Sequence, residues 1–243
     1  MSITVAELIS NGTMSAEVAA TLWAAVDEQR SFLTVAIPRF AGKSTLSNAV
    51  LALRPPDVPL HQVDGSPGEM QRLKREQLGG YLVVAEFSEA PVPHYIWGEP
   101  VRRVFDTLSA GYSLQASLHA PGPEEAVRVI TEGNGIPDDQ ASAINLVLYI
   151  RLFGRDEATF WRRLAHVYEI DYVKSGRPVG RTLFRWHEDS DRFEAVEDPR
   201  GFARDRGDLK ARAALLTDLA RRDRMSDDDV DAAVSAYRAT RPA

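Results

Sequence analysis

The sequence predicts an α/β fold with a mainly parallel sheet, followed by a C-terminal β-hairpin and a helical appendage. Apolar strand candidates alternate with helix candidates from residue 15 to residue 173. The segment 81–87 is almost continuously apolar, as in a strand covered on both faces. Near Arg181 the alternation stops. We therefore expect a core with an N-terminal helical lead-in over residues 1–175, and the appendage over residues 176–243.

The first half of the chain supplies alternating elements of this core. An amphipathic helix is predicted over 15–28, because Val18, Leu22 and Val26 recur at four-residue spacing. The following elements are a strand over 32–37, a helix over 44–53, a strand over 59–63, a helix over 70–76 and the strand over 81–87. A break at Arg54–Pro59 and a turn at Asp64–Gly68 separate them.

The second half continues the alternation and then changes character. The predicted elements are helices over 99–109 and 124–132 and from Pro137, and strands over 113–118, 146–153 and 163–173. Segments 181–186 and 192–196 are typical of an antiparallel hairpin. Two mixed-charge helices follow over 207–222 and 226–240. On the first of them we expect Leu209, Ala213, Leu216 and Leu219 to face inward.

Composition narrows the class of protein. Of 243 residues, 44% are hydrophobic and 26% charged, which is ordinary for a globular protein with a buried core. A net charge of −6 argues against nucleic-acid binding. No apolar run approaches the roughly 20 residues that cross a bilayer, and the N-terminus lacks the pattern of a signal peptide. Cysteine is absent, which excludes disulfides and cysteine-bound zinc. A cytoplasmic protein without direct membrane insertion is expected.

A phosphate-binding loop is predicted where the strand over 32–37 meets the next helix. In Gly42-Lys43-Ser44-Thr45, backbone N–H groups and the lysine would hold the β- and γ-phosphates of ATP, and the Ser44 hydroxyl would bind Mg²⁺. The residues expected to bind nucleotide are Arg39, Phe40, Ala41, Gly42, Lys43, Ser44 and Thr45. The full pattern has a glycine where Ile37 stands, and the next residue, Pro38, lacks an N–H donor.

Three further polar residues end predicted strands and are expected to be catalytic. Glu86 follows the strand's apolar residues about 40 positions after the loop, at the rim where open α/β sheets bind ligands, and would approach Mg²⁺ through water. Asp64 lies on the same rim, or is a turn residue beside Gly65. His119 would contact the γ-phosphate, or simply end its strand.

At these residues the chain resembles the motor ATPases of type II and type IV secretion systems and pili, a family similar to the general secretion pathway E protein. The family's four sequence boxes correspond to residues 41–45, Asp64 with Glu69, residues 85–89 and residues 117–120. The resemblance covers roughly residues 3–173. It implies a RecA-like P-loop NTPase core, ATP and Mg²⁺ as ligands, in-line phosphoryl transfer to water, a homo-oligomer, and partners in a secretion or pilus apparatus.

The chain also departs from the family pattern. Ala85 replaces a glycine, Ser88 an arginine, and Tyr112 the histidine of a Thr-Gly-His motif. The family's N-terminal domain, which supplies arginines to a neighbouring subunit's site, is expected to be lacking. Loss of an arginine supplied by a neighbouring subunit lowers the rate of related phosphoryl-transfer reactions by roughly 10³–10⁵-fold.

Three functions remain open on sequence alone. The first is a divergent ATPase core that binds Mg-ATP, hydrolyses it, and drives or gates a membrane-associated assembly, peripheral to the inner membrane through its partners. The second is a catalytically inactive pseudo-ATPase that serves as a structural or regulatory module. The third is a small-molecule kinase, for which the helix Met70–Glu76 would be the lid.

Overall fold

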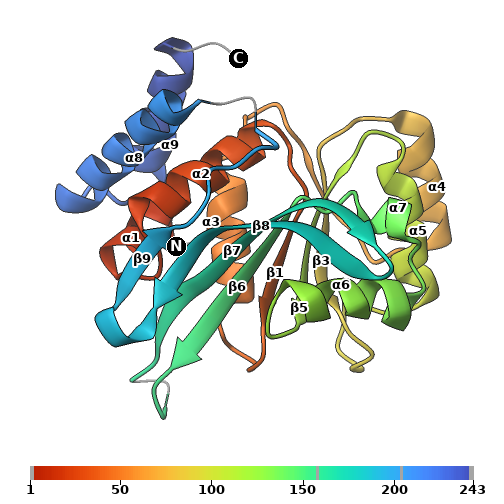
Figure 1. Cartoon of the computed structure of the whole chain (residues 1–243). Helices are drawn as coiled ribbons and strands as arrows, with labels where there is room; N and C mark the ends of the chain where they lie inside the picture. The colour runs from red at the N-terminus through yellow and green to blue at the C-terminus, as the bar shows by residue number, and fades with distance from the viewer. Residues whose placement is uncertain (1–2, 157–158, 203–204, 241–243) are drawn as a thin grey trace.

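The computed structural model describes residues 3–156, 159–202 and 205–240. Within these residues a nine-stranded sheet forms the centre of the molecule (Figure 1). Its strands are β1 (Phe32–Ala36), β2 (Leu60–Gln62), β3 (Tyr81–Phe87), β4 (Tyr95–Ile96), β5 (Ser113–His119), β6 (Leu146–Phe153), β7 (Trp161–Lys174), β8 (Arg177–His187) and β9 (Arg192–Ala195). Their order is β2-β3-β5-β1-β6-β7-β8-β9, and β4 pairs with β3.

The parallel half of the sheet confirms the predicted α/β core with a mainly parallel sheet. Strand β1, which leads into the phosphate loop, lies between β5 and β6 and is parallel to both. Strand β3, which carries Glu86, lies on the far side of β5. The two strands that deliver Lys43 and Glu86 are therefore separated by the strand that ends at His119. All three strands end at the same edge, as parallel strands must.

The antiparallel half extends the same sheet. Strand β7 returns beside β6, β8 beside β7, and β9 beside β8, so the predicted hairpin over 181–196 is confirmed. Ser175 and Gly176 join β7 to β8 with φ values of 51° and 70°, the left-handed conformation that two-residue hairpin turns require. The expected division between residues 175 and 176 falls within this turn.

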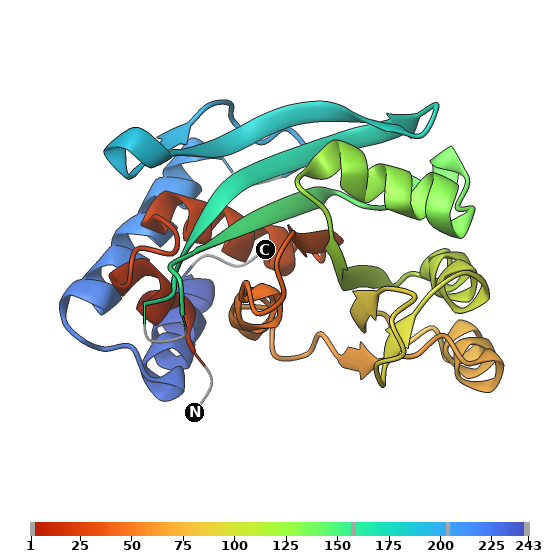
Figure 2. The ribbon, with the colours of Figure 1, turned by 90° about the horizontal axis from the view of Figure 1, so that it is seen from below.

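Helices cover both faces of the sheet. They are α1 (Val5–Ser10), α2 (Ala16–Asp27), α3 (Lys43–Ala52), α4 (Pro67–Glu76), α5 (Glu99–Leu108), α6 (Pro123–Arg128), α7 (Asp138–Ala141), α8 (Arg206–Arg221) and α9 (Asp227–Thr240). One hydrophobic core lies under α1–α3 and a second under α4–α7. Helices α8 and α9 form an outer layer beyond α1 and α2, away from α4 and α5 (Figure 2). Within the described ranges, no helix combines the length and apolarity of a membrane span.

Two local predictions need correction. The helix predicted over 124–132 ends at Arg128 and continues as a π-helical turn over Val129–Gly133, where the Asn134 side chain donates to the Val129 carbonyl at 2.9 Å. Strand β4 was not predicted, because two residues carry no periodicity.

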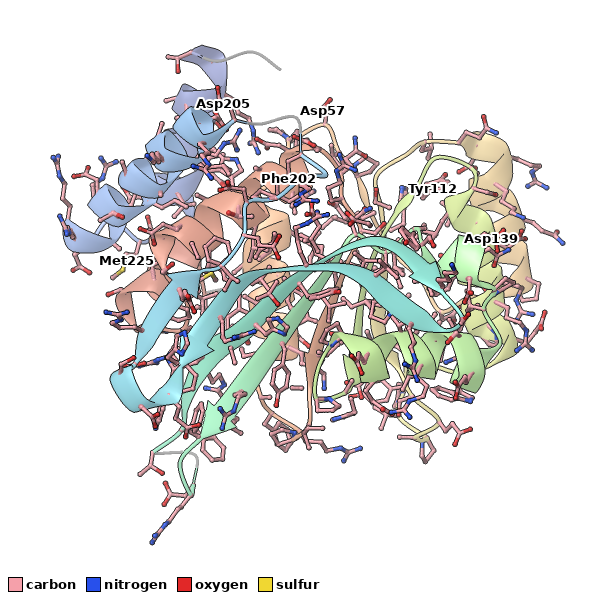
Figure 3. The ribbon with its side chains drawn as sticks, in the orientation of Figure 1. Asp57, Tyr112, Asp139, Phe202, Asp205 and Met225 are labelled. Carbon is pink, nitrogen blue, oxygen red and sulfur yellow. The ribbon has the colours of Figure 1, made fainter. Side chains whose placement is uncertain are left out.

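Tyr112 has a packing role on the α4–α5 side (Figure 3). Its hydroxyl donates to the Leu73 carbonyl at 2.8 Å and accepts from the Leu78 N–H at 3.1 Å.

Candidate functional site

The segment predicted to bind phosphate, which we call the phosphate loop, joins the end of β1 to the start of α3. Phe40 and Gly42 both have positive φ, 61° and 92°, and Gly42 is the residue that caps α3. The loop therefore turns back over the N-terminus of a ten-residue helix, where backbone N–H groups and the helix dipole favour an anion. Ile37 stands where the full phosphate-loop pattern has its first glycine, and its side chain is exposed, at 54% for the residue. The Ile37 carbonyl accepts a hydrogen bond from His119 Nδ1.

Side chains beneath the loop fix α3 against the sheet. The Ser47 hydroxyl on α3 contacts the Thr34 hydroxyl of β1 at 2.8 Å and accepts from the Gln115 amide of β5 at 3.0 Å. All three side chains are buried. Because this network joins the helix to two strands, the position of the loop above it is set by the sheet rather than by the loop alone.

A cavity of about 480 Å³ opens over the loop. All seven residues predicted to bind nucleotide line it, and so do the predicted catalytic residues Glu86 and His119. The described residues that line it are Arg39, Phe40, Ala41, Gly42, Lys43, Ser44, Thr45, Glu86, Val92, Tyr95, His119 and Arg162.

Lys43, Glu86 and His119 form a compact polar cluster inside this cavity, which we call the loop cluster. The Lys43 ammonium lies 3.1 Å from Glu86 Oε2 and 3.5 Å from His119 Nε2. His119 Nε2 lies 3.0 Å from Glu86 Oε1. Lys43 is 8% exposed and Glu86 4%, so the ion pair is largely shielded from water.

The hydrogen bonding of His119 depends on its protonation. Its Nδ1 lies 2.8 Å from the Ile37 carbonyl, which can only accept, so Nδ1 carries a proton. In the neutral ring Nε2 is then an acceptor, and Glu86 Oε1 is buried with no hydrogen-bond donor. A second proton on Nε2 would supply that donor across the 3.0 Å contact. The loop cluster thus contains a carboxylate oxygen that is paired only when the imidazole is charged.

Asp64 and Glu69 lie outside this cavity. Asp64 is exposed, and its Oδ1 accepts from the Ser66 N–H at 2.9 Å in the turn before α4. Glu69 is in the first turn of α4. Strand β2 ends at Gln62 on the edge of the sheet, two strands away from β5, which is why Asp64 shares the rim without reaching the loop. No residue of α4, the lid of the kinase hypothesis, lines the cavity.

Three lining residues were not predicted: Val92, Tyr95 and Arg162. The first two come from the segment after β3. Burial, and then the nearby Glu86 carboxylate, raise the pKa of the Tyr95 phenol, while Arg39 opposes the shift. Arg162 comes from β7. Two arginines at the start of a predicted strand are ordinary, and no sequence pattern indicates that one of them will contact a loop more than 100 positions earlier in the chain.

Positive charge exceeds negative charge around the cavity. Lys43, Arg39 and Arg162 line the cavity, and Glu86 is the one carboxylate among its described lining residues. Among the described residues, neither arginine forms an ion pair with a carboxylate. The surplus of positive charge around the cavity contrasts with the net charge of the whole protein, which is −6. The site is therefore built to attract an anion.

Comparisons with known proteins give distant relatives. No family model matches the sequence. Two uncharacterized proteins of Methanocaldococcus jannaschii are similar to it. MJ1287 is 26% identical in an alignment of 219 positions, which covers 77% of this chain and 77% of the length of MJ1287. MJ0900 is 25% identical in an alignment of 211 positions, which covers 78% of this chain and 38% of the length of MJ0900.

Solved structures with partial similarity include two ATPases. The ATPase DotB of Legionella pneumophila superposes with a TM-score of 0.42 and 14% identity over 58% of this chain. The VirB11 ATPase of the Brucella suis type IV secretion system, in complex with sulphate, gives a TM-score of 0.44 and 15% identity over 63% of this chain. The chain spans about half the length of each, 46% and 52% respectively.

Proposed function

We propose that this protein binds Mg-ATP over its phosphate loop and hydrolyses it as the core of a divergent secretion-type ATPase. The observation that carries the proposal is the surplus of positive charge around a loop that caps a helix N-terminus, with Lys43 and Glu86 at its centre. Three cations against one carboxylate match a polyanionic ligand such as a triphosphate.

Binding would rearrange the loop cluster. In the structure Lys43 is held by Glu86 at 3.1 Å, and an incoming triphosphate would take over the lysine. The Glu86 carboxylate, released from its cation, would then be free to accept a proton from an attacking water. Nucleotide binding and activation of the general base would be one event, because the same ion pair must open for both.

The residues present also fit a magnesium ion. The Ser44 hydroxyl lines the cavity, and Glu86 Oε1 is a buried oxygen without a donor when His119 is neutral, as suits a partner of metal-bound water. Among the described residues, no group of three or more His, Cys, Asp or Glu side chains is placed to hold a metal ion. The remaining magnesium ligands would therefore be phosphate and water oxygens. When bound, the ion would neutralise charge on the transferring phosphoryl group.

His119 would report on the terminal phosphate. Its ring is oriented by the bond from Nδ1 to the Ile37 carbonyl, which leaves Nε2 directed at Glu86 and Lys43. With a second proton on Nε2, the ring would donate to a phosphate oxygen in that place. The ring would therefore exchange a protein partner for a ligand when nucleotide arrives, in the manner of switch residues.

A second candidate, a pseudo-ATPase that binds nucleotide without turnover, is favoured by the loop's own sequence. Ile37 stands in place of the first glycine, and Pro38 removes one N–H donor from the cradle. In either case we propose a cytoplasmic protein, oligomeric when functional, that couples its nucleotide state to partners in a membrane-associated secretion or pilus assembly.

The test is Mg-ATP binding by calorimetry with phosphate release measured in parallel, on wild type, Lys43→Ala and Lys174→Ala. Lys174 is an exposed lysine at the end of β7 and serves as the matched control. Loss of binding in Lys43→Ala alone, with turnover in wild type, supports the ATPase. Binding without turnover supports the pseudo-ATPase. Absence of binding in the folded wild type overturns both.

A further inference from the structure

Arg162 lies against the phosphate loop although it belongs to the antiparallel half of the sheet. It is the second residue of β7, paired with Leu152 of β6. One guanidinium nitrogen, Nη2, donates to the Phe40 carbonyl at 3.0 Å across 122 positions of sequence. The arginine thus reaches the centre of the loop from the strand that neighbours β6.

The guanidinium group of Arg162 is incompletely satisfied. Its Nε is buried and has no hydrogen-bond partner among the residues that the structure describes. No carboxylate of the described residues pairs with it. An arginine has five N–H donors, and a buried donor without a partner destabilises the fold, so such a group is expected to have a partner in another state of the protein.

The loop is shaped to admit this side chain. A Cβ atom at Gly42 would lie 2.9 Å from Cδ and 3.0 Å from Nε of Arg162, closer than side-chain atoms approach one another. Gly42 also has φ of 92°, which side chains rarely tolerate. Glycine at this position therefore serves both the turn and the close approach of the arginine.

The next residue, Arg163, shows what a structural arginine looks like on the same strand. Its Nε and Nη2 donate to the two carboxylate oxygens of Asp191 at 2.7 and 2.8 Å, and its guanidinium lies 4.8 Å from the ring centre of Trp161. Arg163 is thus paired and stacked. Because successive side chains of a strand point to opposite faces, Arg162 lies on the other face of β7, where it lines the cavity.

We propose that Arg162 is a phosphate-binding arginine supplied by the chain to its own site. With nucleotide present, its guanidinium would donate to oxygens of the β- or γ-phosphate, using the donor that is now buried without a partner. The planar guanidinium suits phosphate because it can donate two parallel bonds. This inference rests on the proposed binding of nucleotide, and it gives the site an arginine that does not come from a neighbouring subunit.

The test compares nucleotide affinities of wild type, Arg162→Gln, Arg162→Lys and Arg163→Gln by calorimetry, with Mg-ATP, Mg-ADP and AMP as ligands. We expect Arg162→Gln to weaken Mg-ATP binding by about tenfold or more, as for loss of a charged hydrogen bond. AMP binding should change much less, because that ligand lacks the outer phosphates. Arg162→Lys should recover part of the loss, and Arg163→Gln should stay within about twofold of wild type.

The outcomes separate this inference from the function on which it rests. If wild type binds no nucleotide, the proposed function fails. If wild type binds Mg-ATP and Arg162→Gln binds it equally well, the function stands and the assignment of Arg162 is overturned. The assignment is also overturned if Arg162→Gln weakens all three ligands equally, or if Arg163→Gln has the same effect, because either result indicates a general disturbance of β7. Unfolding curves of each variant establish that the folded protein is being measured.

Discussion

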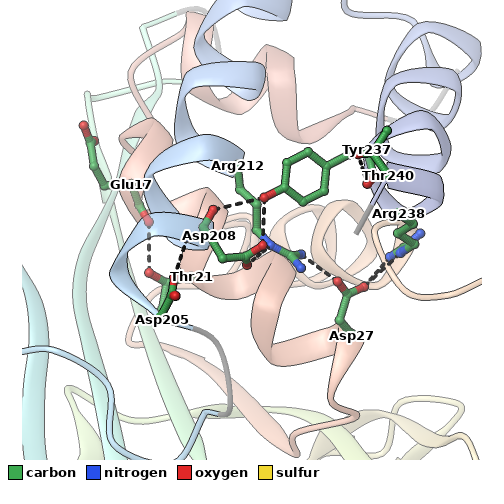
Figure 4. A network of polar contacts seen from close by, with 9 residues as sticks. All are labelled: Glu17, Thr21, Asp27, Asp205, Asp208, Arg212, Tyr237, Arg238 and Thr240. Carbon is green, nitrogen blue, oxygen red and sulfur yellow. Dashed lines mark hydrogen bonds and ion pairs between the residues drawn. The ribbon is translucent and has the colours of Figure 1, made fainter. Parts of the chain in front are cut away.

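Two groups of buried charged side chains in this molecule differ in how completely they are paired. In the loop cluster, Glu86 has one oxygen without a donor while His119 is neutral. The other group, which we call the helix cluster, joins α2 to α8 and α9 (Figure 4). There Arg212 Nη1 donates to Asp27 at 2.6 Å and Arg212 Nε to Asp208 at 2.6 Å.

Further hydrogen bonds pair the remaining charged groups of the helix cluster. The Tyr237 hydroxyl donates to Asp208 Oδ1 at 2.7 Å, and Arg238 Nε donates to Asp27 Oδ1 at 3.1 Å. The Arg212 guanidinium also lies 4.4 Å from the ring centre of Trp23. Satisfied networks of this kind hold elements in one arrangement, whereas unsatisfied buried groups mark places where a ligand or a movement is needed. We therefore expect the helix cluster to control stability and the loop cluster to control activity.

The largest expected effect is on stability, from Arg212→Ala. Arg212 is 2% exposed, and its removal leaves Asp27 and Asp208 buried without their shared cation. Breaking a buried ion pair in this way typically lowers the free energy of unfolding by about 3–5 kcal/mol. Urea denaturation measures the loss. The control is Arg222→Ala, an exposed arginine paired with Asp218, which should cost under about 0.5 kcal/mol. Equal losses in the two variants would contradict the comparison.

Next in size is the effect of Glu86→Gln on turnover. The amide cannot accept a proton from water, so the rate of phosphate release should fall by about 100-fold or more. The free energy of unfolding should fall by less than in Arg212→Ala, because the amide oxygen can still accept from Lys43 and the amide nitrogen can donate to a neutral His119 Nε2. Steady-state phosphate assays and urea denaturation measure the two quantities. A stability loss comparable to that of Arg212→Ala would show that the loop cluster is structural.

A smaller effect is expected from Tyr237→Phe in the helix cluster. The change removes the hydroxyl that bonds Asp208 and leaves the ring in its contact with Trp23, at 5.1 Å between centroids. The free energy of unfolding should fall by about 1 kcal/mol, the usual value of one such bond. Mg-ATP affinity should be unaffected, since α9 does not line the cavity. Tyr172→Phe, at an exposed position, is the control for loss of a hydroxyl.

The smallest effect concerns pH and His166, a half-buried titratable group outside both clusters. Burial, and then Arg185, lower the pKa of His166 below its ordinary value of 6.5. The unfolded chain therefore takes up a proton more readily than the folded one. The stabilising contribution is complete above about pH 6.5 and is lost as pH falls through the lowered pKa. His166→Gln should flatten the fall in unfolding free energy as the pH drops below about 6.5. An unchanged slope would assign the pH dependence to other groups.

The helix cluster also shows where sequence patterns stop being informative. On α8, the predicted inward residues Ala213, Leu216 and Leu219 are buried, while Leu209 is only half-buried. Asp208 and Arg212 are buried beside them, although the helical pattern assigns charged residues to the solvent face. Their burial depends on Asp27 of α2, which is 185 positions from Arg212, and no local pattern encodes that distance.

The sequence alone determined the parallel core and the centre of the candidate site. Alternating apolar segments set the order of strands and helices along the chain, and parallel strands must end at one edge, so Lys43, Glu86 and His119 lie at the same edge wherever such a sheet forms. Only the tertiary structure decided which other groups join them. The edge position of β2 keeps Asp64 away, and the antiparallel return of β7 brings Arg162 to the loop. Those outcomes depend on strand order and register over long separations, which side-chain periodicity within one segment does not specify.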